Sequence, residues 1–159
     1  MTGSSHFATP TIAMKTLLTC LLAGWAITSA SAENLEWMTD LPKAQAKAKA
    51  ENKLVMLDFT GSDWCGWCIK LHKEVFSTDD FAAYAKTNLV LVEVDFPQKK
   101  QLSAAQVKAN DALQTKYRVE GYPTIIVLNP QGATVAKLGY QPGGPKPFIA
   151  QLDKVKRKK

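Results

Sequence analysis

The sequence predicts one α/β domain in which helices flank a central mixed four-stranded sheet. Three observations predict this fold class. Short apolar runs alternate along the chain with longer helix-forming stretches, long connections separate the first three apolar runs, and a tight turn separates the last two. The long crossovers make the first two strands parallel, and the tight turn makes the last two strands an antiparallel hairpin.

The first half of the domain is expected to begin with a helix from the N-cap Asp40 to Glu51. Pro42 lies in its first turn, and its residues are rich in Ala and Lys, which favour helix. The apolar run 54–59 then predicts a buried strand. The remaining elements of this half are a polar loop at 60–63, a helix from Cys65 to about Phe76, a further helix over 77–85 and a buried strand over 89–95.

The second half begins with a polar break at 96–100 and a helix over 104–117. The inner face of this helix is expected to hold Ala105, Val107 or the stem of Lys108, Ala112 and Leu113. A third strand over 124–128 leads through a turn at 129–132 into a fourth strand over 133–138. The last helix, 147–156, follows a break at Gly143-Gly144-Pro145 and is expected to turn Phe148, Ile149, Leu152 and Val155 inward.

Two cysteines lie in the stretch Trp64-Cys65-Gly66-Trp67-Cys68, where a strand and a loop lead into a helix. The first sulfur falls at the helix N-terminus, where unpaired N–H groups and the helix dipole favour a thiolate, the attacking species in disulfide exchange. Two intervening residues place the second sulfur one helical turn on, close enough to close a disulfide. The spacing alone is equally typical of a redox pair and of half of a zinc site.

A structural zinc site needs about four ligands, usually in two spaced pairs. The sequence has no second pair, because Cys20 lies in a segment that we expect to be removed and His6 lies before that segment. His72 is the remaining candidate, and a site made of two cysteines and this histidine on one helix would be strained. We therefore expect no metal and interpret His72 as a solvated helix residue.

Residues 1–32 have the form of a secretory signal peptide, with Met14 expected to be the true start. Lys15 supplies a positive charge, an apolar core of about a dozen residues follows, and Ala30-Ser31-Ala32 predicts cleavage after Ala32. The apolar core is shorter than the roughly 20 residues of a membrane-spanning helix. Export places the remaining cysteine pair in an oxidising compartment. Since so short a loop gains little as a structural staple, the pair indicates redox chemistry.

The basic isoelectric point, about 9.2, does not indicate a nucleic-acid-binding protein. Residues 33–153 contain 14 basic and 14 acidic residues, so the excess of positive charge in the mature domain, 33–159, comes from the tail Lys154–Lys159. A patch for anionic lipid or nucleic acid would be one interpretation of this tail. We favour a solvated terminus that suits the negative end of the last helix, because no aromatic residues are interleaved.

A second motif, Gly121-Tyr122-Pro123-Thr124, lies at the start of the third strand, where a proline is tolerated because it cannot donate to the ladder. Together with the cysteine motif and the final hairpin, it resembles the thioredoxin-fold family over residues 33–154. The stretches 59–65 and 92–99 resemble the exported thioredoxin-like reductases of the DsbH type.

The resemblance implies a role for each residue that matches the family motifs. Cys65 would be the nucleophile that attacks a substrate disulfide, and Cys68 the buried resolving thiol. Pro123 would be a cis-proline that faces the pair, and Tyr122 would offer backbone hydrogen bonds to an extended substrate. Asp58 would take the proton of the resolving cysteine, although a strand-end aspartate paired with a lysine is an alternative.

The residues around the sulfurs also carry expectations. Trp64 would flank the site as an apolar contact, and Gly66 and Trp67, which replace the Gly-Pro of thioredoxin, would contact substrate and tune thiolate stability. The chain departs from the thioredoxin pattern by one extra residue near Ser62, by a longer segment after Pro97, and by Lys73 in place of a kinking proline.

These inferences predict a periplasmic thiol–disulfide oxidoreductase, more specifically a disulfide reductase that acts through a mixed disulfide. Its substrates would be proteins with disulfides, and a membrane electron donor would recharge it. We expect a monomer that uses no cofactor beyond the redox-active pair Cys65–Cys68 and binds no nucleic acid. A disulfide isomerase or oxidase, and a non-catalytic dithiol module for metal delivery or redox sensing, remain the alternatives.

Overall fold

The computed structural model describes residues 1–3 and 35–157. The chain divides into two units, 1–30 and 31–159, and the second unit is the α/β domain. Apart from residues 1–3, the expected signal peptide lies outside the described residues, and so do Met14, Cys20 and the expected cleavage site after Ala32. Within residues 1–3 and 35–157, no helix combines the length and the apolar character needed to cross a bilayer.

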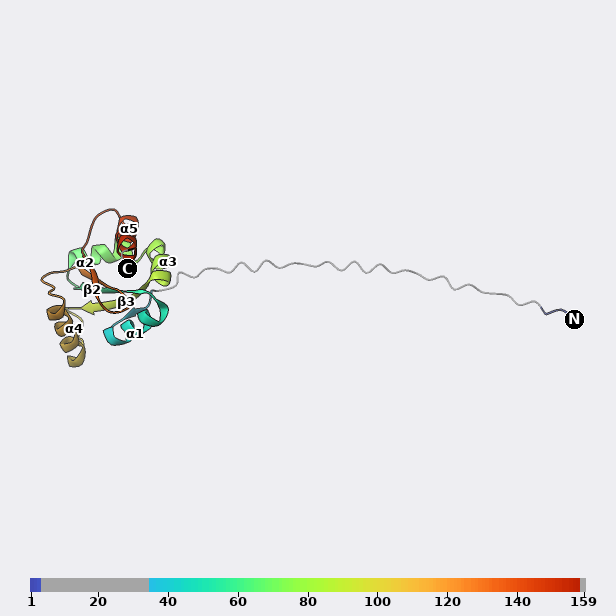
Figure 1. Cartoon of the computed structure of the whole chain (residues 1–159), viewed down its shortest axis with the longest axis horizontal. Helices are drawn as coiled ribbons and strands as arrows, with labels where there is room; N and C mark the ends of the chain where they lie inside the picture. Colours follow the sequence, from blue (N-terminus) through green and yellow to red (C-terminus); the bar gives the residue numbers. More distant parts are fainter. Residues whose placement is uncertain (4–34, 158–159) are drawn as a thin grey trace. The chain divides into compact units, whose positions relative to one another are not determined.

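The domain is an α/β fold with helices on both faces of a mixed sheet, which confirms the predicted fold class (Figure 1). In chain order the elements are β1 (Trp37–Met38), α1 (Leu41–Glu51), β2 (Leu54–Thr60), α2 (Gly66–Leu71), the π-helix η1 (His72–Phe76), α3 (Asp79–Asn88), β3 (Leu89–Asp95), α4 (Ala104–Lys116), β4 (Thr124–Leu128), β5 (Thr134–Leu138) and α5 (Pro145–Lys156).

The sheet has five strands in the order β1-β3-β2-β4-β5, so the prediction of four strands was wrong by one. The missed strand, β1, is two residues long and pairs in parallel with β3. A strand this short shows no alternation in the sequence. The predicted orientations are confirmed, since β2 and β3 are parallel and β4 and β5 are antiparallel.

Each face of the sheet buries its own hydrophobic cluster. Strand β2 is buried along its whole length, and its residues alternate between the two clusters: Leu54 and Met56 face one, Val55 and Leu57 the other. Helices α2, α3 and α5 cover the first face, and α1 and α4 lie on the opposite side (Figure 1). The same alternation decides which face each polar residue of the strand reaches.

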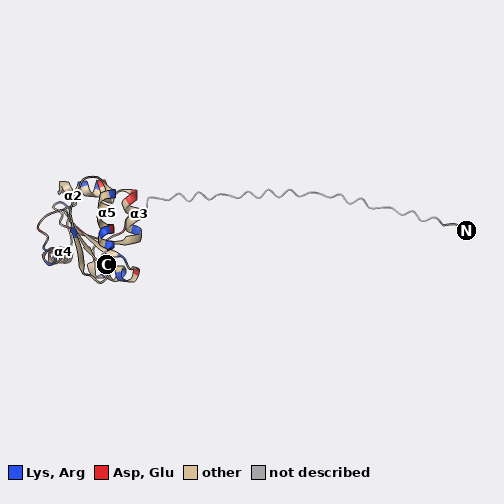
Figure 2. Cartoon of the chain, turned by 45° about the horizontal axis from the view of Figure 1, so that its top comes forward, with Lys and Arg blue, Asp and Glu red and all other residues tan. Residues whose placement is uncertain are grey.

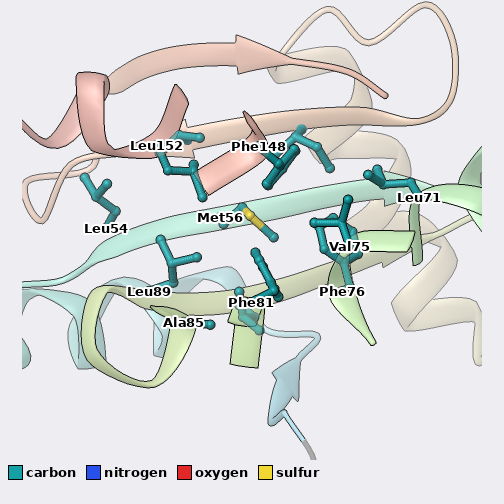
Figure 3. Close-up of a cluster of buried hydrophobic side chains, with 13 residues drawn as sticks. Leu54, Met56, Leu71, Val75, Phe76, Phe81, Ala85, Leu89, Phe148 and Leu152 are labelled. Atoms are coloured by element: carbon teal, nitrogen blue, oxygen red, sulfur yellow. The ribbon is translucent and has the colours of Figure 1, made fainter. Parts of the chain in front are cut away.

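Three phenylalanines fill the centre of the first cluster (Figure 3). The ring of Phe76 lies 4.9 Å from that of Phe81 and 5.6 Å from that of Phe148, measured between centroids. These residues come from η1, α3 and α5, so one aromatic contact network joins three helices. Burial of each ring stabilises the fold by about 2–3 kcal/mol.

The observed helices α1 and α5 lie close to the positions predicted from the sequence. Asp40 caps α1, and its side chain accepts a hydrogen bond from the Lys43 N–H at 3.0 Å, as predicted. Helix α5 begins at Pro145 rather than at Pro147, because a proline in the first turn gives up no hydrogen bond. Its inward residues are as expected, with Phe148 and Leu152 fully buried.

The expected inner face of α4 is confirmed at Leu113, which is half-buried and packs against the second cluster, and was wrong at its other positions. Ala105, Val107, Lys108 and Ala112 are exposed, and the buried residue of this helix is Asn110. Its side-chain amide donates to the backbone oxygen of Asp95 at 2.7 Å. A polar contact therefore fixes α4 at this point, and no apolar residue marks this position in the sequence.

Basic residues are spread over several helices, and acidic residues lie among them (Figure 2). Lys154 and Lys156 lie in the last turn of α5, where cations suit the negative end of the helix. Lys156 donates from Nζ to Asn88 Oδ1. The last two residues of the tail, 158–159, lie outside the described residues.

Candidate active site

Cys65 and Cys68 occupy the junction between the loop after β2 and helix α2. Cys65 is the N-cap of α2, and its sulfur accepts a hydrogen bond from the Cys68 N–H at 3.2 Å. The two sulfurs are joined at 2.10 Å, with the Cα atoms 5.2 Å apart. The N-cap position gives the first sulfur a donor from the helix end, which is the environment that lowers the pKa of a thiol.

Both cysteines are buried in this oxidised form, while the tryptophans beside them are exposed. The exposed fractions are 7% for Cys65 and 4% for Cys68, against 41% for Trp64 and 59% for Trp67. The disulfide therefore sits below an exposed aromatic rim. Gly66, between the cysteines, faces open space, since a Cβ added there would meet no atom within 4 Å.

Asp58 lies on β2, on the sheet face that α2 covers, because it continues the alternation of Leu54 and Met56. It is 7% exposed, and its Oδ1 is buried with no hydrogen-bond partner among the described residues. Burial, and then the nearby carboxylates of Glu93 and Asp95, raise the pKa of Asp58 to about 8. A lysine partner would lower this pKa instead.

Glu93 was not among the site residues predicted from the sequence. It is directly opposite Asp58 in the parallel pairing of β2 with β3, so the two side chains leave the same face of the sheet. Burial and the charge of Asp95 raise the pKa of Glu93, while the charges of Lys100 and His72 act in the opposite direction. The alternation Leu89, Leu91, Glu93 along β3 is the signal that could have indicated it.

His72 is exposed on η1, and its Nδ1 lies 3.0 Å from the Ser77 hydroxyl oxygen. This is consistent with the solvated helix residue that the sequence suggested. Within residues 1–3 and 35–157, no group of three or more His, Cys, Asp or Glu side chains is arranged to hold a metal ion.

The Tyr122–Pro123 peptide bond is cis, and it directly precedes β4, whose first residue, Thr124, is opposite Phe59 of β2. The ring of Tyr122 stacks on Phe96 at 5.1 Å and meets the Trp64 indole edge-on at 6.0 Å. Trp64 in turn donates from Nε1 to the backbone oxygen of Phe96 at 2.7 Å. We call Trp64, Phe96 and Tyr122 the aromatic wall.

A second aromatic contact involves Trp67. Its ring lies 5.3 Å from that of Tyr140, and the Lys70 ammonium lies 5.4 Å from both ring centroids. The Tyr140 hydroxyl donates to Glu74 Oε2 at 2.7 Å. Trp67 thus contacts Lys70 of α2 and Tyr140 of the segment after β5, and Glu74 of η1 holds Tyr140.

The fold brings the two sequence motifs into contact through their aromatic residues. The contact between Trp64 and Tyr122 connects the cysteine motif with the proline motif, although the two are far apart in the chain. Phe96 and Tyr140 were missed, because an aromatic residue in a polar connection carries no local signal of its partner.

Comparison with known proteins agrees with this geometry. A family model described as a thioredoxin-like domain matches residues 41–156. The disulfide bond reductase DsbH of Chlamydia pneumoniae is 35% identical over 122 residues, which are 77% of this chain and 73% of that protein. The thiol:disulfide interchange protein DsbD of Pasteurella multocida is 32% identical over 115 residues, which are 70% of this chain but 18% of that protein.

A solved structure of a DsbH oxidoreductase superposes with a TM-score of 0.72 at 34% identity, and the match covers 77% of this chain and 84% of the other. The fold, the helix-capping cysteine pair and these matches lead to one conclusion. This chain belongs to the thioredoxin-like family and is a thiol–disulfide oxidoreductase.

Proposed function

We propose that this protein reduces disulfides in exported proteins through its Cys65–Cys68 pair. The Cys65 thiolate attacks one sulfur of the substrate disulfide, and the other substrate sulfur leaves as a thiolate. Cys68 then loses its proton and attacks Cys65 in the mixed disulfide, which releases the second substrate sulfur. The substrate gains two electrons, and the enzyme is left with the Cys65–Cys68 disulfide.

One observation carries this assignment of roles. The Cys68 N–H donates to the Cys65 sulfur at 3.2 Å, and Cys65 is the N-cap of α2. A hydrogen bond from the helix end stabilises a negative charge on Cys65 more than on Cys68, which lies inside the first turn. This contact supports Cys65 as the attacking sulfur and Cys68 as the resolving one.

Asp58 is proposed to take the proton that Cys68 loses. A thiol has an ordinary pKa of about 8.5, and the pKa of Asp58 is raised to about 8. Proton transfer between two groups of similar pKa is nearly balanced in free energy, so the ionised fraction of Asp58, a minority at pH 7 that grows toward pH 8, can accept the proton and return it to the leaving thiolate or to solvent. Its buried Oδ1, which has no hydrogen-bond partner in the part of the chain that the structure describes, lies on the α2 face of the sheet and supports this role.

The surroundings of the pair are proposed to bind the substrate. The backbone of Tyr122, next to Pro123, would hydrogen-bond an extended segment that carries the disulfide. Trp64, Gly66 and Trp67 would form the apolar surface that this segment crosses, since both indoles are exposed.

The N-terminal segment 1–32 is proposed to direct export to the periplasm, with cleavage after Ala32, which leaves the domain 33–159. A membrane electron donor would then return the enzyme to the dithiol. The names of the relatives, a disulfide bond reductase and a thiol:disulfide interchange protein, support this scheme. We expect a monomer without an added cofactor.

The roles of the cysteines are tested by insulin reduction with the wild type, Cys65→Ser and Cys68→Ser. Both variants should lose turnover, and Cys68→Ser should accumulate a mixed disulfide with insulin that runs as a covalent adduct without reductant. Mixed disulfides in Cys65→Ser instead would reverse the assignment. Absence of turnover in the wild type, together with tight copper binding, would favour a metal-delivery module.

The direction of electron flow is tested by redox titration of the pair against glutathione. A potential well below that of the glutathione couple is expected for a reductase, and a potential near the strongest known protein oxidants would favour an oxidase. Recovery of activity from a scrambled disulfide substrate would favour an isomerase.

A further inference from the structure

One carboxylate, that of Asp63, connects the active-site loop to a second segment of the chain by three hydrogen bonds, which we call the tie. Asp63, two residues before Cys65, accepts hydrogen bonds from three consecutive backbone N–H groups: Gln98 at 2.9 Å on Oδ1, and Lys99 at 2.7 Å and Lys100 at 3.0 Å on Oδ2. Both oxygens are used, and all three donors belong to the connection that follows β3.

Other hydrogen bonds link the same two segments, with donors on both sides. Asp95 accepts from the Ser62 N–H at 2.9 Å and from the Ser62 hydroxyl at 2.7 Å. The Phe96 N–H donates to the Thr60 oxygen at 2.8 Å, and the Trp64 indole donates to the Phe96 oxygen at 2.7 Å. The bonds to Asp95 and Phe96 fix the start of the connection, and those to Asp63 fix its next turn.

Packing holds the connection weakly. Residues 98–100 are exposed and belong to no helix or strand. A cavity of about 390 Å³ lies against the connection, lined by Phe96, Pro97, Gln98 and Lys100 and, from α4, by Val107, Asn110 and Asp111. Open volume lies on one side and solvent on the other, so among the described residues the three hydrogen bonds to Asp63 are the contacts that hold the backbone of residues 98–100.

We propose that Asp63 is a positioning residue, which holds residues 96–100 against the active-site loop. The aromatic wall of Trp64, Phe96 and Tyr122 is thereby kept in the position in which it binds the substrate polypeptide beside Cys65. Phe96 connects the two ends of this arrangement, since it lies directly before the tied residues, supports the Trp64 indole and stacks on Tyr122. The proposal rests on the proposed function in taking Cys65 as the attacking sulfur.

The tie is expected to persist throughout the pH range of an activity assay. The Gln98 N–H, the N–H groups of Lys100 and Lys99, and the charge of Lys99 hold the pKa of Asp63 below its ordinary value of 3.8. A substitution is therefore needed to break the tie.

The first test measures amide hydrogen exchange of residues 98–100 by NMR in the oxidised protein. The three amides should be protected in the wild type, although they lie outside helices and strands, and should exchange much faster in Asp63→Asn. In that variant one carboxylate oxygen becomes an NH₂ group that cannot accept. Asp111→Asn is the matched control, because it removes a carboxylate from the other side of the same cavity and makes none of these hydrogen bonds.

The second test compares a protein substrate with a small one. Asp63→Asn should raise the KM for insulin by about 3- to 10-fold, because the wall is no longer held in its binding position. Hydroxyethyl disulfide is too small to reach across the wall. The rate of Asp63→Asn with this substrate and the redox potential of the variant should therefore stay near the wild-type values. Asp63→Glu keeps both acceptor oxygens and should restore part of the lost affinity for insulin.

The outcomes separate the proposals. Unprotected amides in the wild type, or freed amides with an unchanged KM for insulin, would overturn the positioning role alone. An equal loss of activity toward insulin and hydroxyethyl disulfide in Asp63→Asn would show that Asp63 acts on Cys65 itself, and this result would also overturn the positioning role. A wild type that reduces neither disulfide would refute the proposed function, while the exchange measurement would still report on the tie.

Discussion

Replacement of Asp58 by asparagine should make the oxidised protein more stable at neutral pH and remove much of the pH dependence of its stability. Asp58 is buried, one of its oxygens has no hydrogen-bond partner among the described residues, and two other carboxylates lie near it. Such a site disfavours the ionised carboxylate, and Asp58→Asn keeps the shape of the side chain while removing the ionisation.

The magnitude follows from the two pKa values. The pKa of Asp58 is 3.8 when the group is unperturbed and about 8 in the folded protein. Between these values the folded state keeps a proton that the unfolded state has lost, so the free energy of unfolding falls by about 1.4 kcal/mol per pH unit. Between pH 4 and pH 7 the loss is about 4 kcal/mol, and below pH 4 the group has no effect.

The assay is urea unfolding of the oxidised wild type and of Asp58→Asn, followed by tryptophan fluorescence without reductant, at several pH values from about 4 to 8. The buried amide has a cost of its own, but this cost does not change with pH. The difference in stability between the two proteins should therefore move in favour of the variant by about 4 kcal/mol from pH 4 to pH 7. A difference that stays constant would refute the account of Asp58 as a buried, raised-pKa carboxyl group.

Three further predictions concern neighbouring features. Glu93→Gln removes a charge that raises the pKa of Asp58, so the NMR titration midpoint of the Asp58 carboxyl should fall; an unchanged midpoint would show that the two do not interact. Phe81→Ala should lower the free energy of unfolding in urea by about 3–5 kcal/mol, because the ring is fully buried among aromatic neighbours, whereas exposed Val135→Ala should change it by less than about 1 kcal/mol. Asn110→Ala leaves the Asp95 backbone oxygen without its partner and should lower the melting temperature, at a cost of about 1–3 kcal/mol; an unchanged melting temperature would mean that water replaces the amide.

Local signals in the sequence were sufficient for the strands that are continuously apolar. The apolar runs that became β2, β3 and β4 are buried almost throughout, and such runs are recognisable without a structure. The position of Cys65 at a helix start was likewise readable, because strand, loop and helix follow one another within a few residues. Strand β1 was not readable, since two residues cannot show alternation.

Contacts between residues far apart in the chain could not be predicted from the sequence. That Glu93 lies opposite Asp58 depends on the register between β2 and β3, and one residue of slip would place the two side chains on opposite faces. Most of the inner face of α4 was missed for a related reason, because its buried residue, Asn110, is polar and its partner is the backbone oxygen of Asp95 at the end of β3. Residues of this kind are recognised only when their partners are in place.

The π-helix η1 has a consequence for how the interior is filled. Its hydrogen bonds span one residue more than those of an α-helix, and two adjacent residues, Val75 and Phe76, both reach the interior. The buried positions Cys68, Leu71 and Val75 keep the spacing of an α-helix face. The wider turn therefore lets Phe76 join Phe81 and Phe148 without displacing Val75 from the face that holds Cys68.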